Sequence, residues 1–358
     1  MVGERYADDE HAPSPVPAPP VSPHKECPHA RSPLGRTGRD VSAVGLGTWQ
    51  LGADWGDVSE TDALTVIDAA VAAGVTLLDT ADVYGDGRSE QLIGTFLAAH
   101  PGHGLTVATK MGRRLPQESA NYSPANFRAW VDRSRTNLGV DTLDLVQLHC
   151  PPSEVIEADA TYDALDALVA DGSIAAYGVS VETCEQALAA IARPGTASVQ
   201  IILNPFRLKP LDEVLPAATT AGVGILARVP LASGLLSGRY DASTTFAAND
   251  HRTFNRHGEA FDQGETFSGV DFGVGLQAVG ELTAALPDGV SLPAATLAWI
   301  VSRPGVTSVI PGARTPEQAR SNSAAADLLA SGFDVAEFDA AVRRTYEEHL
   351  RAAIHPRW

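Results

Sequence analysis

From about Asp40 onward the chain repeats one pattern, in which a short apolar run is followed by an Ala-rich amphipathic segment. The runs are rich in Val, Ile and Leu and cover Ala43–Thr48, Val75–Asp79, Leu105–Lys110, Leu143–His149, Ile174–Ser180, Ser198–Asn204, Val223–Val229 and Thr307–Pro311. The segments between them have helical spacing and cover Thr61–Ala73, Ser89–Ala99, Pro124–Leu138, Thr161–Ala170, Cys184–Ala192, Leu211–Ala221, Gly275–Leu286, Leu292–Val301 and Pro316–Leu328. Strands that are apolar almost throughout are buried on both faces, which predicts parallel pairing through helical crossovers.

These strand–helix units match a single closed (β/α)8 barrel of the TIM type in number and length. An open, doubly wound α/β sheet is the alternative fold. That class often carries a Gly-rich GxGxxG turn after its first strand. Here the first run ends in Gly45–Trp49 and no such turn opens a helix after it. The sequence therefore favours the barrel.

The two ends of the chain and one internal segment add to this barrel. Residues 1–33 hold eight of the 24 prolines and few large apolar side chains, so we expect a disordered, extended tail followed by one barrel domain over residues 34–358. His24, Cys27 and His29 lie close together in the tail, but no second ligand cluster accompanies them and we expect no metal site. Residues 239–274 form a long connection after the seventh strand, which we expect to cover a ligand. Residues 335–358 predict a C-terminal helical extension whose last residues pack against the barrel.

Charge and cysteine usage limit the classes of partner. The net charge is −18, so phosphate backbones and anionic lipid are repelled, and neither a nucleic acid nor a membrane is an expected partner. The three cysteines, Cys27, Cys150 and Cys184, are widely spaced and fit a reducing compartment. No apolar run is long enough to span a bilayer, and the N-terminus lacks the apolar core of a secretory signal. These features predict a cytoplasmic protein.

Polar side chains stand at the carboxyl ends of three successive predicted strands. Asp79 ends the second strand and Tyr84 follows it, Lys110 ends the third and His149 ends the fourth. Taken singly, these residues have ordinary structural explanations: a helix cap, an aromatic lid, a surface charge and a histidine at the barrel rim. Because the carboxyl ends of barrel strands meet at one face, we expect all four to converge in a site.

The four side chains together suit one kind of chemistry. A phenol is a poor proton donor at neutral pH, and we expect Lys110 to lower the pKa of Tyr84 while Asp79 holds the ammonium in place. His149 can orient or polarise a carbonyl oxygen. This combination fits proton donation to an oxygen whose carbon receives a hydride. The sequence has no CxxC or HExxH metal motif, and the serines Ser180 and Ser233 lack a GxSxG nucleophile turn.

The chain resembles the aldo-keto reductase family, in its bacterial NADP(H)-dependent form, from about Leu34 to the C-terminus. The motifs that carry the resemblance are Gly45–Gln50, Leu78–Glu90, Ala108–Lys110, Asp141–His149, Tyr177–Ser180, Val199–Gln200 with Asn204, Pro230–Gly238, and Ile310–Gln318 with Asn322. The resemblance implies a barrel that binds NADP(H) and reduces a small-molecule carbonyl, with Asp79, Tyr84, Lys110 and His149 as the catalytic tetrad.

The resemblance also implies a set of cofactor contacts. Ser180 and Gln200 would hold the nicotinamide carboxamide, residues 228–235 would pass under the ribose and pyrophosphate, and Arg239 would lie near the phosphates. The full set is Thr48, Trp49, Asp79, Ser180, Gln200, Arg228, Val229, Pro230, Leu231, Ser233, Gly234, Leu235, Arg239, Gly312, Arg314, Gln318 and Asn322. For the last residues, and for Gln318 above all, helix capping and loop charge are the alternative roles.

Three positions depart from the family pattern. The family often has Asn where Val181 stands, an aromatic ring under the nicotinamide where Arg228 stands, and Lys where Gly312 stands. The guanidinium of Arg228 can stack on the ring, but we expect its charge to disfavour the oxidised, cationic form. Trp49 and Trp55 are candidate pocket walls, with packing at the barrel rim as the alternative.

Two alternative functions share this site. The same residues can run the reaction backwards as an alcohol or sugar dehydrogenase, and a barrel of this family can serve as a cofactor-loaded regulatory subunit. The intact tetrad favours an enzyme, because a protein that only binds cofactor has no need of it. The sequence sets neither a substrate nor an oligomeric state.

Overall fold

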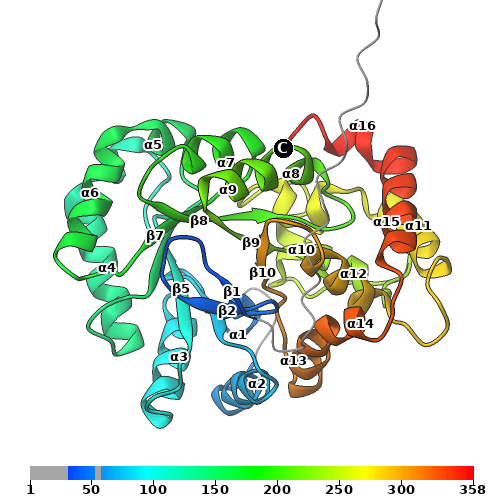
Figure 1. Cartoon of the computed structure of the whole chain (residues 1–358), viewed down its shortest axis with the longest axis horizontal. Helices are drawn as coiled ribbons and strands as arrows, with labels where there is room; N and C mark the ends of the chain where they lie inside the picture. Colours follow the sequence, from blue (N-terminus) through cyan, green and yellow to red (C-terminus); the bar gives the residue numbers. More distant parts are fainter. Residues whose placement is uncertain (1–30, 53–57) are drawn as a thin grey trace, which may run out of the picture.

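The computed structural model describes residues 31–52 and 58–358. Within them, eight parallel strands form one curved sheet in the order β3 to β10 (Figure 1). The strands are β3 (Leu46–Gly47), β4 (Leu77–Asp79), β5 (Thr106–Met111), β6 (Leu145–His149), β7 (Tyr177–Ser180), β8 (Thr196–Ile202), β9 (Gly224–Arg228) and β10 (Val306–Val309). Each overlaps one predicted apolar run, which confirms the predicted (β/α)8 fold.

The first and last strands meet and close the barrel. Val44 bridges to Val309 and Gly47 to Gly312, both in parallel. Gly45 N donates to Val309 O over 2.8 Å. A Cβ on Gly47 would lie 2.9 Å from Ile310 O, so glycine is what allows the chains to come this close. Of the predicted first run, only Leu46–Gly47 is regular strand.

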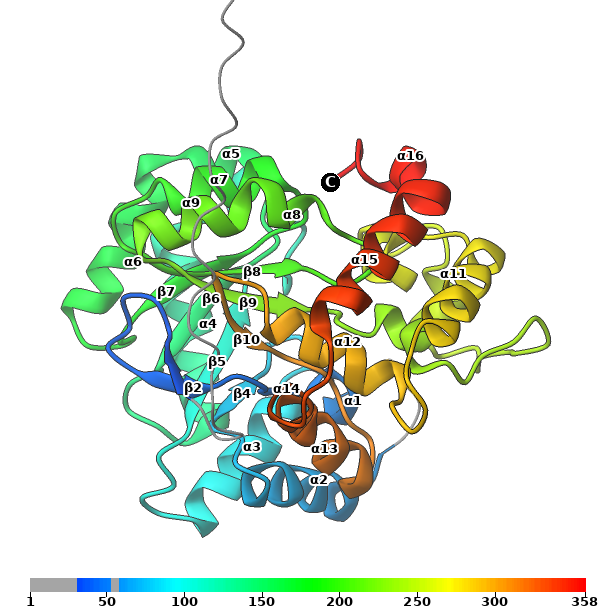
Figure 2. The same ribbon diagram turned by 45° about the vertical axis from the view of Figure 1, so that its right-hand side comes forward.

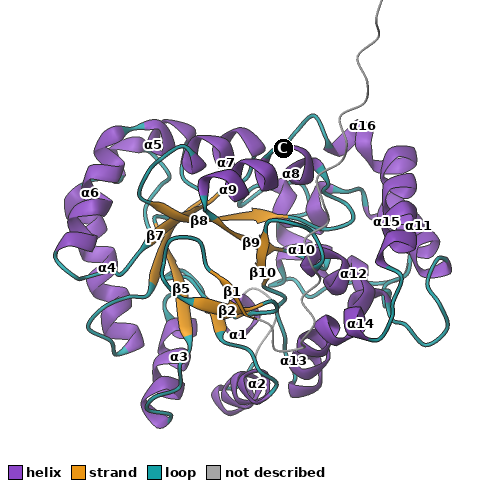
Figure 3. Cartoon of the chain, in the orientation of Figure 1, coloured by secondary structure: helices purple, strands orange, loops and turns teal. Residues whose placement is uncertain are grey.

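Helices surround the sheet and give the alternating order that the sequence predicts (Figure 3). Between strands β3 and β10 lie α1 (Trp49–Gly52), α2 (Glu60–Ala72), α3 (Arg88–Ala99), α4 (Pro124–Leu138), α5 (Ser153–Glu157), α6 (Asp159–Ala170), α7 (Cys184–Ile191), α8 (Lys209–Asp212), α9 (Val214–Ala221), α10 (His251–Phe254), α11 (Phe272–Ala284) and α12 (Leu292–Val301). Local signals set their limits: Ser123 caps α4, Pro124 occupies its first turn and Gly139 ends it at φ 67°.

A short hairpin closes the amino-terminal end of the barrel. Strands β1 (Arg31–Pro33) and β2 (Asp40–Ser42) pair antiparallel. Leu34, which follows β1, and Val41, within β2, are fully buried and join a cluster with residues from inside the barrel, such as Leu77 and Leu145. The predicted tail boundary at residue 33 is therefore wrong, because Arg31–Pro33 belong to the fold. Residues 1–30, with His24, Cys27 and His29, lie outside the described residues.

The C-terminal part is helical, as predicted. It comprises α13 (Pro316–Ser323), η5 (Ala324–Ala326), α14 (Asp327–Ala330), α15 (Val335–Thr345), the π-helical turn η6 (Tyr346–Leu350) and α16 (Arg351–Ile354). Helix α15 runs beside α11 and α12 (Figure 2). The side chain of Trp358 is buried, and its indole N–H donates to Asp262 over 3.1 Å. Among the described helices, none combines the length and apolar character needed to cross a bilayer.

Candidate functional site

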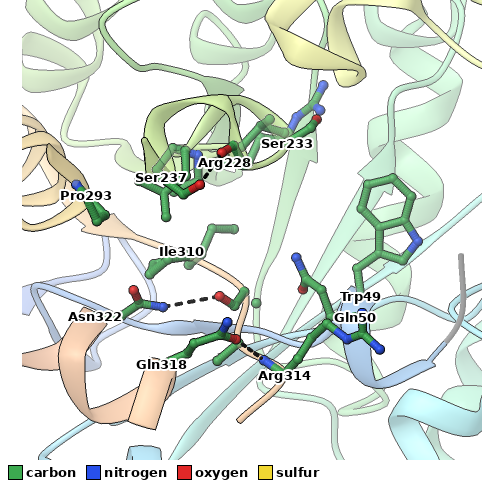
Figure 4. A pocket seen from close by; sticks show the side chains of 18 of the residues that line it. Trp49, Gln50, Arg228, Ser233, Ser237, Pro293, Ile310, Arg314, Gln318 and Asn322 are labelled. Atoms are coloured by element: carbon green, nitrogen blue, oxygen red, sulfur yellow. Dashed lines mark hydrogen bonds between the residues drawn. The ribbon is translucent and has the colours of Figure 1, made fainter. Parts of the chain in front are cut away.

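A cavity of about 640 Å³ opens at the carboxyl ends of the strands. Asp79, Tyr84 and His149 line one part of it, and the turn after β9 and the start of α13 line other parts. Figure 4 shows Arg228 and Ser233 across Ile310 from Arg314, Gln318 and Asn322. One cavity is thus lined by three of the four predicted catalytic residues and by the predicted adenosine-end residues.

The four predicted catalytic residues come together. Lys110 is buried behind Tyr84, and its Nζ donates to Asp79 Oδ1 over 2.6 Å, to Thr80 O over 2.9 Å and to Tyr84 Oη over 3.2 Å. The His149 ring stands edge-on to the Tyr84 ring, with 5.9 Å between centroids. Phenol, ammonium and carboxylate therefore form one chain of contacts, with the imidazole beside the phenol.

Burial changes the pKa of Tyr84 more than the neighbouring Lys110 does. Burial raises the pKa of the phenol and Lys110 lowers it, and the net shift is upward. We expected a net lowering, so that expectation is corrected: the hydroxyl stays protonated at neutral pH and is available as a donor. Burial also lowers the pKa of Lys110, but Asp79 and Tyr84 raise it by more, so the ammonium stays charged.

His149 is a neutral imidazole in this environment. Burial lowers its pKa well below the usual value, and Arg113, Lys110 and Arg228 lower it further. Its Nδ1 is buried without a hydrogen-bond partner in the part of the chain that the structure describes. A neutral ring that lines the cavity can donate one N–H to a carbonyl oxygen without adding charge.

Ser180 and Gln200 both line the cavity, as the predicted carboxamide contacts should. Gln200 Nε2 donates to Asp79 Oδ2 over 2.7 Å, so its amide nitrogen is engaged with the tetrad. Ser180 Oγ lies 3.5 Å from Cys150 Sγ. Gln200 therefore belongs to the tetrad's support as well as to the predicted cofactor site.

Thr48 and Trp49 also line the cavity, beside Asp79 and Tyr84. Thr48 Oγ1 donates to Asp79 O over 2.8 Å. The Trp49 indole stacks on Tyr84 with 5.9 Å between ring centroids and 17° between planes. Trp49 is thus a pocket wall, whereas Trp55 lies outside the described residues.

The turn after β9 is tightly bent. Val229, Ala232 and Ser233 all adopt positive φ, and the 3₁₀ turn η2 (Ala232–Ser237) follows. A Cβ on Gly234 would lie 2.3 Å from Tyr240 Oη, so only glycine fits there. The predicted contacts that line the cavity here are Arg228, Val229, Pro230, Leu231, Ser233, Gly234 and Arg239. Leu235 does not line the cavity: it is buried in the apolar core, so its predicted contact is corrected.

Gly312, Arg314, Gln318 and Asn322 line the far end of the cavity, as predicted. Gln318 Oε1 accepts from the Arg314 backbone N–H over 2.8 Å, and Asn322 Nδ2 donates to Gly312 O over 3.1 Å (Figure 4). Both side chains therefore brace the turn before α13. A Cβ on Gly312 would lie 1.9 Å from Gln50 Oε1, so a larger residue here would require the flexible Gln50 side chain to move.

Arg228 is held by two carboxyl groups that the sequence analysis missed. Its Nη2 lies 2.8 Å from Glu182 Oε2, its Nη1 lies 3.9 Å from Glu265 Oε1, and Nη2 also donates to Val181 O over 3.0 Å. The positive charge of Arg228, which we expected to act on the nicotinamide, is therefore opposed by neighbouring carboxyl groups. Glu182 stands two residues after the fifth-strand motif, so a signal for it is present in the sequence, whereas no motif marks Glu265.

The pKa values of the two carboxyl groups, Glu182 and Glu265, are shifted in opposite directions. Burial raises the pKa of Glu182, but Arg228 and Arg113 lower it by more. Burial also raises the pKa of Glu265, and although Arg113 opposes this, Glu182 adds to it and the pKa rises. Cys150, whose Sγ lies within 4.8 Å of both carboxyl groups, has a pKa raised to about 12 by burial. A protonated thiol and arginine-paired carboxyls do not make a metal site.

Other cavity-lining residues were also missed: Gln50, Ser237, Tyr240, Arg252, Pro293, Ala294, Leu297, Glu317 and Ser321. Tyr240 and Arg252 belong to the 239–274 segment, which supports the expectation that this segment covers a ligand. Arg252 Nε donates to Asp250 Oδ1 over 2.8 Å. Such contacts depend on the path of a long loop, which residue spacing does not specify.

Comparison with known proteins agrees with the fold. The model of the Aldo/keto reductase family matches residues 43–343. The oxidoreductase YqkF of Bacillus subtilis, named as uncharacterized, is 30% identical over 323 residues, which is 89% of this chain and 94% of that protein. The aldo-keto reductase YhdN of the same organism is 30% identical over 291 residues, with 80% and 85% covered. The solved glycerol dehydrogenase of Gluconobacter oxydans superposes with a TM-score of 0.70 at 30% identity, covering 90% of this chain and 96% of its own.

Proposed function

Because this chain belongs to the aldo/keto reductase family, we propose that it is an NADP(H)-dependent oxidoreductase that reduces a small-molecule aldehyde or ketone to an alcohol. The observation that carries the proposal is the contact chain from Asp79 through Lys110 to Tyr84, with His149 beside the phenol in the cavity wall. Tyr84 delivers the proton to the carbonyl oxygen. His149, as a neutral donor, orients that oxygen.

Lys110 and Asp79 act through Tyr84. The ammonium lies 3.2 Å from the phenol oxygen, so it stabilises the phenolate that remains after the proton has left. Asp79 fixes the ammonium and keeps it charged. When the dinucleotide is bound, it supplies the hydride to the carbonyl carbon.

The residues present fit a dinucleotide. The cavity is elongated, polar groups for a carboxamide stand at the tetrad end, and a bent turn with Arg239 follows β9. At the other end, Arg314 precedes α13, whose first-turn N–H groups and dipole favour an anion. In a protein of net charge −18, cations placed here are what make a phosphate acceptable. We propose that Arg314 holds the 2′-phosphate and that NADPH is preferred over NADH.

A second direction is supported by one specific comparison. The Gluconobacter oxydans relative is a glycerol dehydrogenase, so oxidation of an alcohol or sugar by the same residues is the alternative working direction. Tyr84 then accepts the proton that it donates in reduction. A cofactor-loaded regulatory subunit is the third candidate, and the intact tetrad argues against it.

The test uses the purified protein with NADPH and a panel of aldehydes, ketones and sugars, and with NADP⁺ and a panel of polyols. Consumption or formation of the reduced nicotinamide is followed by its absorbance. We expect consumption of NADPH with at least one carbonyl. Tight binding of NADPH without turnover on any panel would instead favour the regulatory subunit.

A further inference from the structure

The 239–274 segment inserts one buried carboxyl group into the wall of the cavity. Glu265, at the end of η3 (Gln263–Glu265), is 6% exposed and lines the cavity. Its Oε1 lies 2.8 Å from Arg113 Nη2 and 3.9 Å from Arg228 Nη1. A residue of the long connection thus reaches two arginines that follow or end barrel strands β5 and β9.

The position of Glu265 is fixed on both sides. Ser233 Oγ donates to Glu265 O over 2.9 Å and accepts from Phe267 N over 3.1 Å. Asn204 Nδ2 donates to Ser268 Oγ over 2.7 Å, which ties the adjoining turn η4 (Phe267–Gly269) to the end of β8. A Cβ on Gly269 would lie 2.3 Å from the Trp358 ring, so this turn also packs directly against the indole. Glu265 is therefore part of a rigid wall.

The charges around Arg228 balance only if both carboxyl groups are counted. Arg113 and Arg228 are the two cations, and Glu182 and Glu265 are the two acids that contact them. Of the other titratable groups close by, His149 and Cys150 are neutral, and Arg207 and Asp262 add one charge of each sign beside Glu182. Without Glu265, this part of the wall would carry a net positive charge.

We propose that Glu265 sets the relative affinity of the site for oxidised and reduced coenzyme, by opposing the charge of Arg228. The inference rests on the proposed function, which puts the nicotinamide over Arg228. The oxidised ring carries a positive charge and the reduced ring is neutral. A carboxylate in the wall therefore stabilises the oxidised form and leaves the reduced form little affected. This role makes Glu265 a specificity-determining residue of the 239–274 segment.

The test is a pair of fluorescence-quenching titrations, with NADP⁺ and with NADPH, at about pH 8, where a carboxyl of raised pKa is more fully ionised. The variant is Glu265→Gln, which keeps the shape and an oxygen for Arg113. We expect NADP⁺ to bind about tenfold more weakly and NADPH to stay within about threefold of wild type. Glu259→Gln, an exposed position in the same segment, is the control and should change neither affinity.

A second variant covers the case in which Glu265→Gln does not fold. Glu182→Gln removes the carboxyl on the other side of Arg228. Like Glu265→Gln, it should weaken NADP⁺ binding more than NADPH binding. Equal weakening of both coenzymes would show a structural role for Glu265, and an unchanged ratio would show that the wall charge is irrelevant; either result overturns the inference. If the wild-type protein binds neither coenzyme, the proposed function fails as well. If the wild-type protein binds coenzyme but the variants leave the ratio of NADP⁺ to NADPH affinity unchanged, only this inference fails and the proposed function stands.

Discussion

Gln200 Nε2 lies 2.7 Å from Asp79 Oδ2, and the other oxygen of that carboxylate lies 2.6 Å from Lys110 Nζ. Asp79 therefore joins a residue of the predicted nicotinamide site to the ammonium beside Tyr84. A hydrogen bond to a charged group contributes about 1.5–3 kcal/mol. The orientation of Asp79, and through it that of Lys110, depends on this amide.

Replacing Gln200 with leucine should lower turnover by about tenfold to a hundredfold, the rate equivalent of one hydrogen bond to a charged group. Asp79 would lose its shorter amide contact and hold Lys110 less well. Steady-state rates with saturating coenzyme measure the effect. Gln147→Leu is the matched control, because Gln147 Nε2 is 3.5 Å from the same oxygen and its loss should cost less. Equal losses for the two variants would contradict this assignment.

Replacing Tyr84 with phenylalanine should leave the coenzyme dissociation constant within about twofold and reduce turnover by 10²–10⁴-fold, about the usual contribution of general acid catalysis. Only the proton donor is removed, because the ring remains to stack on Trp49. Tyr162→Phe, at a buried hydroxyl on α6 outside the cavity lining, should keep full activity. Turnover of Tyr84→Phe within about tenfold of wild type would remove Tyr84 from the proton-donor role.

The convergence of the tetrad was predictable because it depends on strand direction alone. Parallel strands of a barrel end at one face, so polar residues placed at the ends of successive apolar runs must meet there. Asp79, Lys110 and His149 each end a predicted run, and the structure joins them around Tyr84. Ser180 and Gln200, which the family resemblance predicted, also line the cavity.

The rest of the site depends on contacts that spacing does not encode. Glu265 meets Arg113 across 152 positions of sequence, by way of a connection without regular periodicity. The β1–β2 hairpin was missed because each strand has only three residues, too few to show alternation. The net acidity of Tyr84 was misjudged because burial outweighs the neighbouring ammonium, and the depth of a side chain is not visible in sequence.

Asp82 provides a prediction about stability. It is fully buried, neither carboxyl oxygen has a hydrogen-bond partner in the described part of the chain, and burial together with Glu90 raises its pKa to about 7. Between about pH 4 and this value the folded state keeps a proton that the unfolded state has lost. The free energy of unfolding therefore falls as pH rises through this range.

Asp82→Asn removes that dependence. We expect the variant to be more stable than wild type by about 1–3 kcal/mol at about pH 8, with the gain shrinking toward zero at about pH 4. Urea unfolding at the two pH values measures it. Asp68→Asn, at an exposed position of α2, should show no such pH-dependent gain. A constant difference at both pH values would mean that the carboxyl of Asp82 does not titrate in this range.

The choice of coenzyme should depend on Arg314, which lines the cavity just before α13. NADPH differs from NADH by a 2′-phosphate, which an arginine grips bidentately at the amino end of a helix. We expect Arg314→Ala to weaken NADPH binding by about 1.5–3 kcal/mol and to leave NADH binding almost unchanged. Arg320→Ala on the same helix is the control, because that side chain is 55% exposed and pairs with Glu317. Fluorescence titration of both coenzymes measures the difference. An equal loss for NADPH and NADH would mean that Arg314 contacts the adenine or supports the fold, and that the phosphate is recognised by another residue.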